Sequence, residues 1–358
     1  MVGTSPHIED GFRFVRTLPV LRRKRFWLGV LISAVFLAFF LVRTDISEIR
    51  EAFSGADYLL AAAAVPIYFV GYWLRAMRWG LLLRPVANVV TARLYPVVLI
   101  GLMSNNVAPM RIGELVRAFL VGQRESISKS AAFGTIAVDR TFDGLTLVAV
   151  LGVVTALSDT DAGRQSLGIG AALLFVAGTA VLVGLAFSPL RVRNLLLRVA
   201  RFLPERLSSK AEEALDAFLS GLAAIRSPGV LVIAAGVSLA SWLVEASMYY
   251  VVGEAFHLGV GFDVYLIIAA AANLALSIFA SPGGVGPFEL ATREVLVLYN
   301  VSSASASAYA IALHALLLVP VIVVGFVLLW SMHMSLRQLL GIPDEPPRVS
   351  VAEAGASE

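Results

Sequence analysis

The 358-residue sequence contains no cysteine, which excludes disulfide bonds, thiolate metal sites and cysteine nucleophiles. Histidine is scarce, and the spacing of His7, His257, His314 and His333 is not that of metal ligands. Charged residues make up 15% of the chain, against roughly 25% in an ordinary soluble domain. We therefore expect no metal and no cofactor. No nucleophile lies beside a base in the pattern of an enzyme, so we also expect no catalytic activity.

Apolar residues are correspondingly abundant in the sequence. They account for 58% of the chain, and the mean hydropathy is +0.83. A soluble globule of this length could not bury so much apolar surface, so the sequence predicts an all-α, polytopic integral membrane protein. Several runs approach the ~20 residues that a membrane-crossing helix needs. The predicted spans are 27–42, 58–79, 131–157, 167–187, 229–252 and 304–330.

Two further apolar zones, Leu94–Leu120 and Val264–Tyr299, are too long for one helix and carry chain breakers and charges at their midpoints. We interpret each as a re-entrant hairpin of two half-helices. Non-helical backbone at membrane depth survives only where protein buries it or where it lines a wet cavity. Both hairpins should therefore lie inside the bundle. The residues expected to break them are Pro109, Gly113, Pro282, Gly283, Gly284 and Gly286.

Lysine and arginine are distributed unevenly along this topology. With the N-terminus in the cytoplasm, the cytoplasmic segments hold 22 of these residues and the external loops hold three. This bias predicts cytoplasmic N- and C-termini in a multi-pass protein of the cell membrane. The basic charge lies along membrane edges, where anionic lipid attracts it, and this argues against a nucleic-acid partner. Arg75 and Arg78, beside Trp73 and Trp79, are interpreted as an interfacial anchor.

The predicted organisation is a basic cytoplasmic segment at 1–26, a transmembrane domain at 27–330 and a cytoplasmic tail at 331–358. Segment 188–226 alternates apolar and charged residues. It is interpreted as an amphipathic helix on the cytoplasmic surface, with a partner-docking arm as the alternative.

The two halves of the transmembrane domain have the same predicted order of spans and hairpin but opposite orientations in the membrane. They cover about 27–157 and about 167–330. Such inverted repeats with discontinuous helices at the membrane midplane are typical of alternating-access transporters.

Charged side chains at membrane depth are costly, so their default interpretation is functional. Three arginines qualify, namely Arg111, Arg140 and Arg293. Twice as many carboxylates do: Glu114, Asp139, Asp143, Glu245, Glu289 and Glu294.

The first cluster lies at the break of the first hairpin. Arg111, Glu114 and Arg117 follow one another at a spacing of three and share one broad helical face. Asn105 and Asn106 can satisfy exposed backbone groups beside them. Arginine and the N-terminus of the new helix both suit a phosphate or carboxylate, so we expect an anion site here. The alternative is an internal ion pair between Arg111 and Glu114 that only locks the hairpin.

In the second cluster, Asp139 and Asp143 lie one helical turn apart with Arg140 between them. Arg140 can neutralise either acid, and the other acid then needs a second cation, for which Arg111 is a candidate. We expect Arg111, Glu114, Arg140 and Asp143 to share one cavity, because isolated charges at this depth would be prohibitively costly.

The third cluster lies at the break of the second hairpin, where Glu289 and Arg293 are expected to pair at i, i+4. Glu245 lies in a polar stripe of its span that faces either a cavity or another helix. His314 is interpreted as a hydrogen-bonded core residue that could border the same cavity.

Three motifs follow one another along the chain: Asn106, Pro109, Arg111, Gly113, Glu114 and Arg117, then Asp139, Arg140 and Asp143, then Pro282 to Glu289. In this order they resemble the flippase-like transmembrane region of the lysylphosphatidylglycerol synthase family. The resemblance covers nearly the whole chain and implies a protein that moves or handles a polar lipid across the bilayer. The usual glutamate of the second motif is replaced by Asp139, and only a short polar tail follows Trp330. We therefore expect a stand-alone member without the soluble synthase domain.

Two functions follow as hypotheses. The first is transbilayer movement of a polar or anionic lipid, such as a phospholipid or a polyprenyl-phosphate-linked lipid, through a charged midplane cavity. Its substrate-binding residues would be Asn105, Asn106, Arg111, Glu114, Arg117, Asp139, Arg140, Asp143, Glu289 and Arg293. The alternative is a membrane scaffold that recruits or regulates a glycosyltransferase or a lipid-modifying enzyme.

Overall fold

The computed structural model describes residues 46–107, 112–157, 205–278 and 281–332, with a few single positions between 170 and 180. Throughout this part of the chain the regular structure is helical. The elements are α3 (Ile46–Ser54), α4 (Tyr58–Ala63), α5 (Val65–Leu83), α6 (Thr91–Val107), α7 (Gly113–Arg124), α8 (Lys129–Leu157), α11 (Glu205–Gly221), η2 (Leu222–Arg226), α12 (Pro228–Ala255), α13 (Phe262–Ile278), η3 (Pro282–Gly284), α14 (Pro287–Leu298) and α15 (Ser303–Ser331).

Four helices are long and apolar enough to cross a membrane: Tyr58–Leu83, Lys129–Leu157, Pro228–Ala255 and Ser303–Ser331. With 26 to 29 residues each, they are about 40 Å long, more than the ~30 Å of a hydrocarbon core. They coincide with the predicted spans 58–79, 131–157, 229–252 and 304–330. The predicted spans 27–42 and 167–187 lie outside the described residues.

Capping side chains and a proline lie where three of these long helices begin. The Asp57 carboxylate accepts hydrogen bonds from the backbone N–H groups of Leu59 and Leu60, both at 3.0 Å, and so caps α4. Ser302 caps α15 in the same way through the N–H of Ser305, at 3.1 Å. Pro228 stands at the start of α12, where its missing N–H costs nothing.

Both predicted hairpin zones are pairs of shorter helices with a break between them. The 17 residues of α6 and the 12 residues of α7 correspond to about 26 Å and about 18 Å, each less than the hydrocarbon thickness. The pair packs tightly: a Cβ built on Gly113 would lie 2.0 Å from the carbonyl oxygen of Gly101. α13 and α14 form the second pair, joined through η3.

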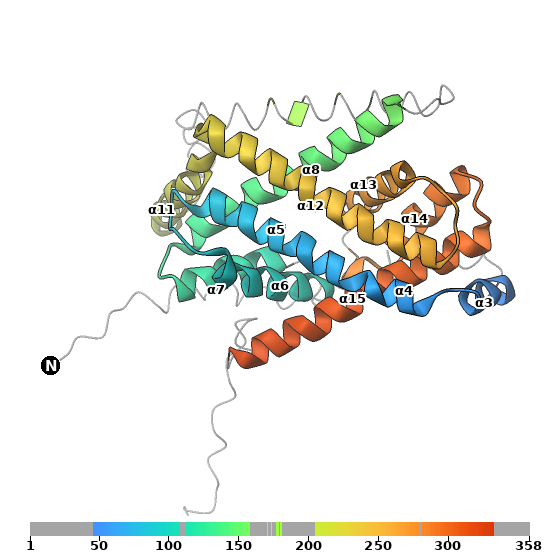
Figure 1. Ribbon diagram of the computed structural model, residues 1–358. Coiled ribbons are helices and arrows are strands. Elements are labelled where there is room, and N and C mark those ends of the chain that lie inside the picture. The colour runs from blue at the N-terminus through green and yellow to red at the C-terminus, as the bar shows by residue number, and fades with distance from the viewer. Residues whose placement is uncertain are drawn as a thin grey trace, which may run out of the picture.

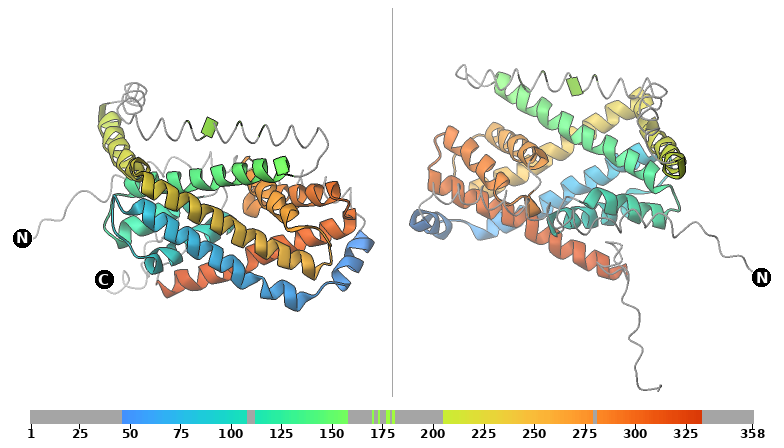
Figure 2. Two further views of the ribbon diagram at one scale, coloured as in Figure 1. Left: turned by 45° about the horizontal axis from the view of Figure 1, so that its top comes forward. Right: turned by 180° about the vertical axis from the view of Figure 1, so that it is seen from behind.

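The two helix pairs lie at opposite ends of the bundle and their tips meet in its interior (Figures 1 and 2). The end of α6 contacts η3, and a Cβ on Gly283 would lie 3.4 Å from the carbonyl oxygen of Asn106. Gly283, Gly284 and Gly286 have φ values of 61°, 77° and 97°, a region that favours glycine, so this tip needs its glycines.

Of the predicted segment 188–226, the structure describes residues 205–226, which begin with α11. This helix packs against the beginning of α8. A Cβ on Gly134 would lie 2.3 Å from the carbonyl oxygen of Phe218, so glycine permits this close crossing. The Phe133 and Phe218 rings lie 6.3 Å apart beside it.

Candidate functional site

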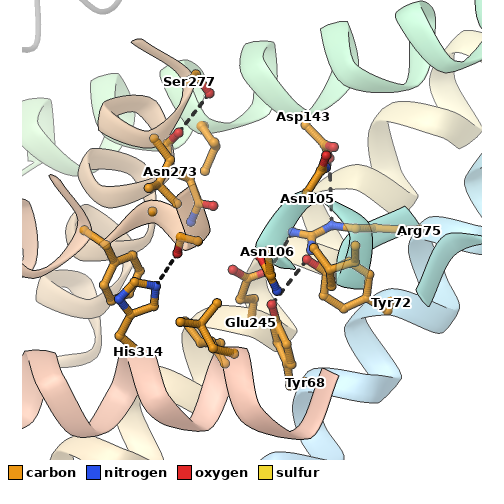
Figure 3. Close-up of a pocket in the computed structure, with 18 of the residues that line it drawn as sticks. Tyr68, Tyr72, Arg75, Asn105, Asn106, Asp143, Glu245, Asn273, Ser277 and His314 are labelled. Atoms are coloured by element: carbon orange, nitrogen blue, oxygen red, sulfur yellow. Dashed lines mark hydrogen bonds and ion pairs between the residues drawn. The ribbon is translucent and has the colours of Figure 1, made fainter. Parts of the chain in front are cut away.

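A cavity of about 220 Å³ lies where the hairpin tips meet the long helices (Figure 3). Every helix from α5 to α8 and from α12 to α15 is represented in the lining. The polar and charged lining residues are Tyr68, Tyr72, Arg75, Asn105, Asn106, Glu114, Arg140, Asp143, Trp242, Glu245, Tyr249, Asn273, Ser277, Ser281 and His314.

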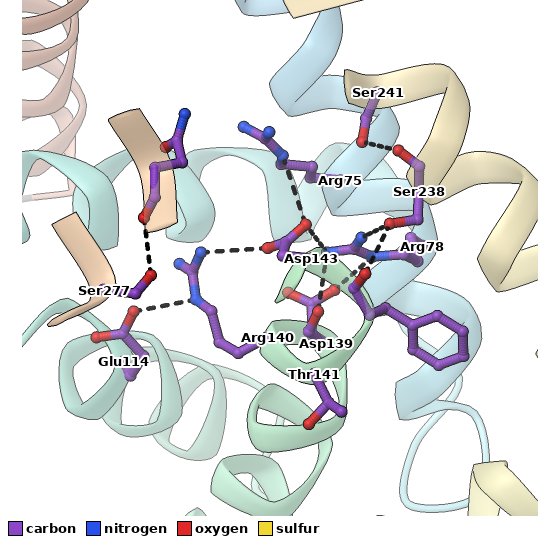
Figure 4. Close-up of polar contacts among 12 residues, drawn as sticks. Arg75, Arg78, Glu114, Asp139, Arg140, Thr141, Asp143, Ser238, Ser241 and Ser277 are labelled. Atoms are coloured by element: carbon purple, nitrogen blue, oxygen red, sulfur yellow. Dashed lines mark hydrogen bonds and ion pairs between the residues drawn. The ribbon is translucent and has the colours of Figure 1, made fainter. Parts of the chain in front are cut away.

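The centre of the charge network is Arg78 on α5, whose side chain is fully buried (Figure 4). Its guanidinium contacts Asp139 Oδ1 and Asp143 Oδ1, both at 2.8 Å, and donates to Ser238 Oγ at 2.7 Å. Arg78 therefore joins both acids of α8 to α12. The interpretation of Arg75 and Arg78 as an interfacial anchor is wrong, because both side chains are buried among carboxylates.

Arg75 lies one turn before Arg78 and faces the cavity (Figure 3). Its Nη2 atom is 2.6 Å from Glu245 Oε2, and its Nε atom is 3.9 Å from Asp143 Oδ1. The guanidinium also lies 4.3 Å from the centre of the Trp242 ring and 4.7 Å from that of Tyr72. The two rings and the carboxylates hold this arginine in one position.

Arg117 of α7 is buried behind the cavity. Its guanidinium contacts Asp139 Oδ2 at 3.1 Å and lies 4.3 Å from the centre of the Trp79 ring. Trp79 in turn donates its indole N–H to Thr135 Oγ1 at 3.0 Å. Arg117 thus fixes the first hairpin to α8 and does not line the cavity.

Arg140 and Glu114 are the most exposed pair of the network. The Arg140 side chain is 42% exposed and that of Glu114 is 24% exposed, with Nε and Oε1 3.1 Å apart. Arg140 also reaches Asp143 Oδ2 at 3.3 Å. Asn105 donates to Glu114 at 3.2 Å and accepts the Gly113 N–H at 2.7 Å, so it closes the break of the first hairpin.

The structure brings Glu114, Arg140 and Asp143 to one cavity. The expected fourth member, Arg111, and the expected break at Pro109 lie outside the described residues. The acids of α8 find their cations in Arg75, Arg78 and Arg117. The sequence interpretation placed Arg75 and Arg78 at the membrane interface and Arg117 in the first cluster. Asn106, Glu245 and His314 also line the cavity.

The third cluster divides in two. Glu289 of α14 lies 2.6 Å from His314 Nδ1 and accepts the Gly286 N–H at 2.7 Å. Arg293 contacts Glu294 and donates to Ser303 Oγ at 2.6 Å, at the contact of α14 with α15. In these contacts Glu289 and Arg293 do not form the i, i+4 pair that the sequence predicted. Glu289 instead lies toward the hairpin tip, and Arg293 lies toward its base.

The fold and the site define a polytopic helical membrane protein with a charged internal cavity. The family model of the lysylphosphatidylglycerol synthase transmembrane region matches residues 26–325, and the chain belongs to this family.

Glycosyltransferase AglD of Haloferax volcanii is 30% identical over 88% of this chain, and the match spans 56% of AglD. The chain thus covers little more than half of that relative. Two UPF0104 membrane proteins of Methanothermobacter thermautotrophicus are each 28% identical. The matches cover 79% and 78% of this chain and 87% and 84% of those proteins.

Proposed function

We propose that the protein moves a lipid with a polar or anionic headgroup between the two leaflets of the cell membrane. The observation that carries the proposal is the cavity at the meeting point of the two hairpin tips, with the half-exposed Arg140 on its lining. A headgroup would occupy the cavity while the acyl or polyprenyl chains stay in the surrounding lipid. The family membership supports a lipid-related role.

Arg140 is the group we assign to the headgroup phosphate. A phosphate would take the place of Glu114 on the guanidinium, and Glu114 would keep its hydrogen bond from Asn105. Arg78 and Arg117 are too deeply buried to reach a ligand and instead hold the acids of α8 in place. The amide groups of Asn106 and Asn273 and the hydroxyl group of Ser277 would form hydrogen bonds with neutral polar groups of the headgroup.

Access from both leaflets would come from the opposed hairpins. We propose that α6–α7 and α13–α14 are re-entrant, that the two halves form an inverted repeat, and that both termini are cytoplasmic. The basic residues at the helix ends support this orientation. Arg84, Arg93, Arg124, Lys129 and Arg226 are exposed at the end of the bundle from which α6–α7 enters.

Vesicles that contain the purified protein and a fluorescent anionic phospholipid or a polyprenyl phosphate test the proposal. The wild type should exchange lipid between leaflets faster than empty vesicles. Arg140→Gln should reduce the rate at least about tenfold, because a hydrogen bond to a charged group contributes ~1.5–3 kcal/mol. Arg93→Gln, a change of a 69% exposed surface arginine, is the matched control and should leave the rate unchanged.

The double variant Arg140→Gln/Glu114→Gln keeps the net charge of the cavity and separates transport from folding. It should fold like the wild type and still exchange lipid slowly. Wild-type rates of lipid exchange in both Arg140→Gln and the double variant, for every lipid class tested, would contradict the proposal.

A glycosyltransferase link is the second candidate function. The relative AglD is named a glycosyltransferase, and the matched region is part of a longer chain. In this case the protein would be a membrane scaffold or regulator for a glycosyltransferase or lipid-modifying enzyme. Replacement of the cavity charges by neutral residues would then leave the cellular phenotype intact, whereas replacement of charged residues within 188–226 would not.

A further inference from the structure

His314 connects the tip of the second hairpin to α15 by two hydrogen bonds. Its Nδ1 atom lies 2.6 Å from Glu289 Oε1, and its Nε2 atom lies 2.9 Å from the carbonyl oxygen of Gly283. The imidazole stacks on the Phe288 ring at a centroid distance of 4.4 Å. His314 and Glu289 are 5% and 7% exposed, so water contributes little to their solvation. We call these two residues the His–Glu pair.

The geometry fixes the number of protons on the His–Glu pair. A backbone carbonyl only accepts, so Nε2 carries a proton and donates it to Gly283 O. The contact between Nδ1 and the carboxylate then needs a second proton, held either by the imidazolium or by the carboxylic acid. In both forms the pair is electrically neutral.

Loss of that second proton changes the pair from neutral to a net charge of −1. The neutral imidazole keeps one proton, so either Nδ1 would face Glu289 Oε1 at 2.6 Å or Nε2 would face the Gly283 carbonyl oxygen at 2.9 Å with no proton between the two atoms, which is repulsive. The hairpin tip would move away from α15 until water solvates the two groups. The released proton passes to water in the cavity, since His314 lines it.

We infer that the His–Glu pair is a proton-binding site that closes the second hairpin onto α15 when it holds its proton and releases the hairpin when it does not. The inference that the His–Glu pair binds and releases a proton does not depend on the proposed function. Its role as the step that couples proton movement to lipid movement rests on the proposed function.

Other titratable and charged groups face the His–Glu pair from the elements around it. The polar side chains that α6 and α13 contribute to the described lining carry amide or hydroxyl groups, namely Asn105, Asn106, Asn273 and Ser277. The titratable and charged groups that line the same cavity as His314 are Glu245 and Tyr249 on α12, Arg140 and Asp143 on α8, Glu114 on α7, and Tyr68, Tyr72 and Arg75 on α5.

The absence of native cysteine permits a direct test by pulsed electron paramagnetic resonance. Spin labels at Ile278→Cys and Val319→Cys report the distance from the hairpin tip to α15, and both positions are exposed, at 74% and 57%. In the otherwise native protein, we expect one short distance near pH 5 and a second, longer distance that grows toward about pH 8, because histidine side chains change charge within this range.

Two variants of the His–Glu pair should shift this behaviour in opposite directions. Glu289→Gln supplies a permanent N–H to Nδ1, so the short distance should persist at every pH. His314→Phe keeps the stack on Phe288 but removes both hydrogen bonds, so the longer distance should predominate throughout. Glu254→Gln, the same change at an exposed site on α12, is the matched control and should retain the pH dependence.

A wild-type distance that does not change between these pH values would overturn the inference, and so would a pH dependence that survives Glu289→Gln. In vesicles, lipid exchange by the wild type should respond to pH, and exchange by Glu289→Gln should not. If the distances behave as expected but no lipid moves, the proton site stands and the proposed function fails.

Discussion

Arg78 is the residue on which the buried charge network depends. Four acceptors surround its guanidinium: Asp139 Oδ1 and O, Asp143 Oδ1 and Ser238 Oγ, at 2.7 to 3.1 Å. Lysine offers one point charge in place of this planar set of donors and could not serve all four. Arg78 therefore joins α5, α8 and α12 in the interior of the protein through charged hydrogen bonds.

Arg78→Ala should strongly destabilise the protein. Removal of one partner of a buried ion pair leaves an uncompensated charge and costs ~3–5 kcal/mol. Arg93→Ala, which removes a surface partner of Glu125, should cost about 0–1 kcal/mol. Thermal unfolding of both variants in detergent measures the difference. Equal stabilities would contradict the role assigned to Arg78.

Charge balance in the sequence could have identified the two missed arginines, Arg75 and Arg78. Six carboxylates at membrane depth faced three arginines, and the structure supplies three further buried arginines, Arg75, Arg78 and Arg117. Arg75 and Arg78 lie inside the predicted span 58–79, at a spacing of three. Their neighbouring tryptophans suggested the membrane interface instead. The partners lie more than 60 positions away in the chain, so only the surplus of negative charge pointed to them.

The helices of each hairpin approach closely because glycine lies at the contact. A Cβ on Gly113 would lie 2.0 Å from the backbone oxygen of Gly101, a distance that no relaxed structure permits. A Cβ on Gly236 of α12 would meet nothing within 4 Å. The same substitution should therefore have opposite effects at these two positions.

Gly113→Ala should destabilise the protein by about 1–3 kcal/mol, the usual cost of overpacking. Gly236→Ala should be neutral or stabilise the protein by up to about 1 kcal/mol, because alanine favours a helix more than glycine does. Chemical unfolding of the two variants tests the hairpin contact. A stabilising Gly113→Ala would show that α6 and α7 do not pack as described.

The periodicity of the sequence predicts elements better than it predicts their contacts. Four long apolar runs match four long helices, and the breakers Pro282, Gly283 and Gly284 fall between α13 and α14. Contact between Asn106 and Gly283 joins tips that are far apart in the chain, and no local pattern encodes it. The pairing of Glu289 with His314 in place of Arg293 was missed for the same reason.

The orientation of the whole molecule in the membrane is a prediction that single cysteines can test in a chain without native cysteine. A membrane-impermeant maleimide added outside intact cells should label Glu254→Cys and should not label Ser128→Cys until the cells are opened. Both positions are exposed, and they lie at opposite ends of the bundle. Labelling of Ser128→Cys from outside would overturn the proposed topology.

The cavity is the feature that makes the whole molecule a candidate lipid transporter, and Gly144 of α8 offers the most direct test. Gly144 lines the cavity, and a Cβ there would meet nothing within 4 Å, so a larger side chain can enter the cavity without a clash. Gly236 is equally open, lies on an exposed helix face, and provides the same substitution outside the cavity.

The measurement is the rate of lipid exchange between leaflets in vesicles that contain Gly144→Leu or Gly236→Leu at equal amounts of folded protein. Gly144→Leu should reduce the rate at least about tenfold, because one leucine side chain fills a large part of a cavity of about 220 Å³. Gly236→Leu should exchange lipid like the wild type. Equal rates for both variants and the wild type would contradict passage of the headgroup through this cavity.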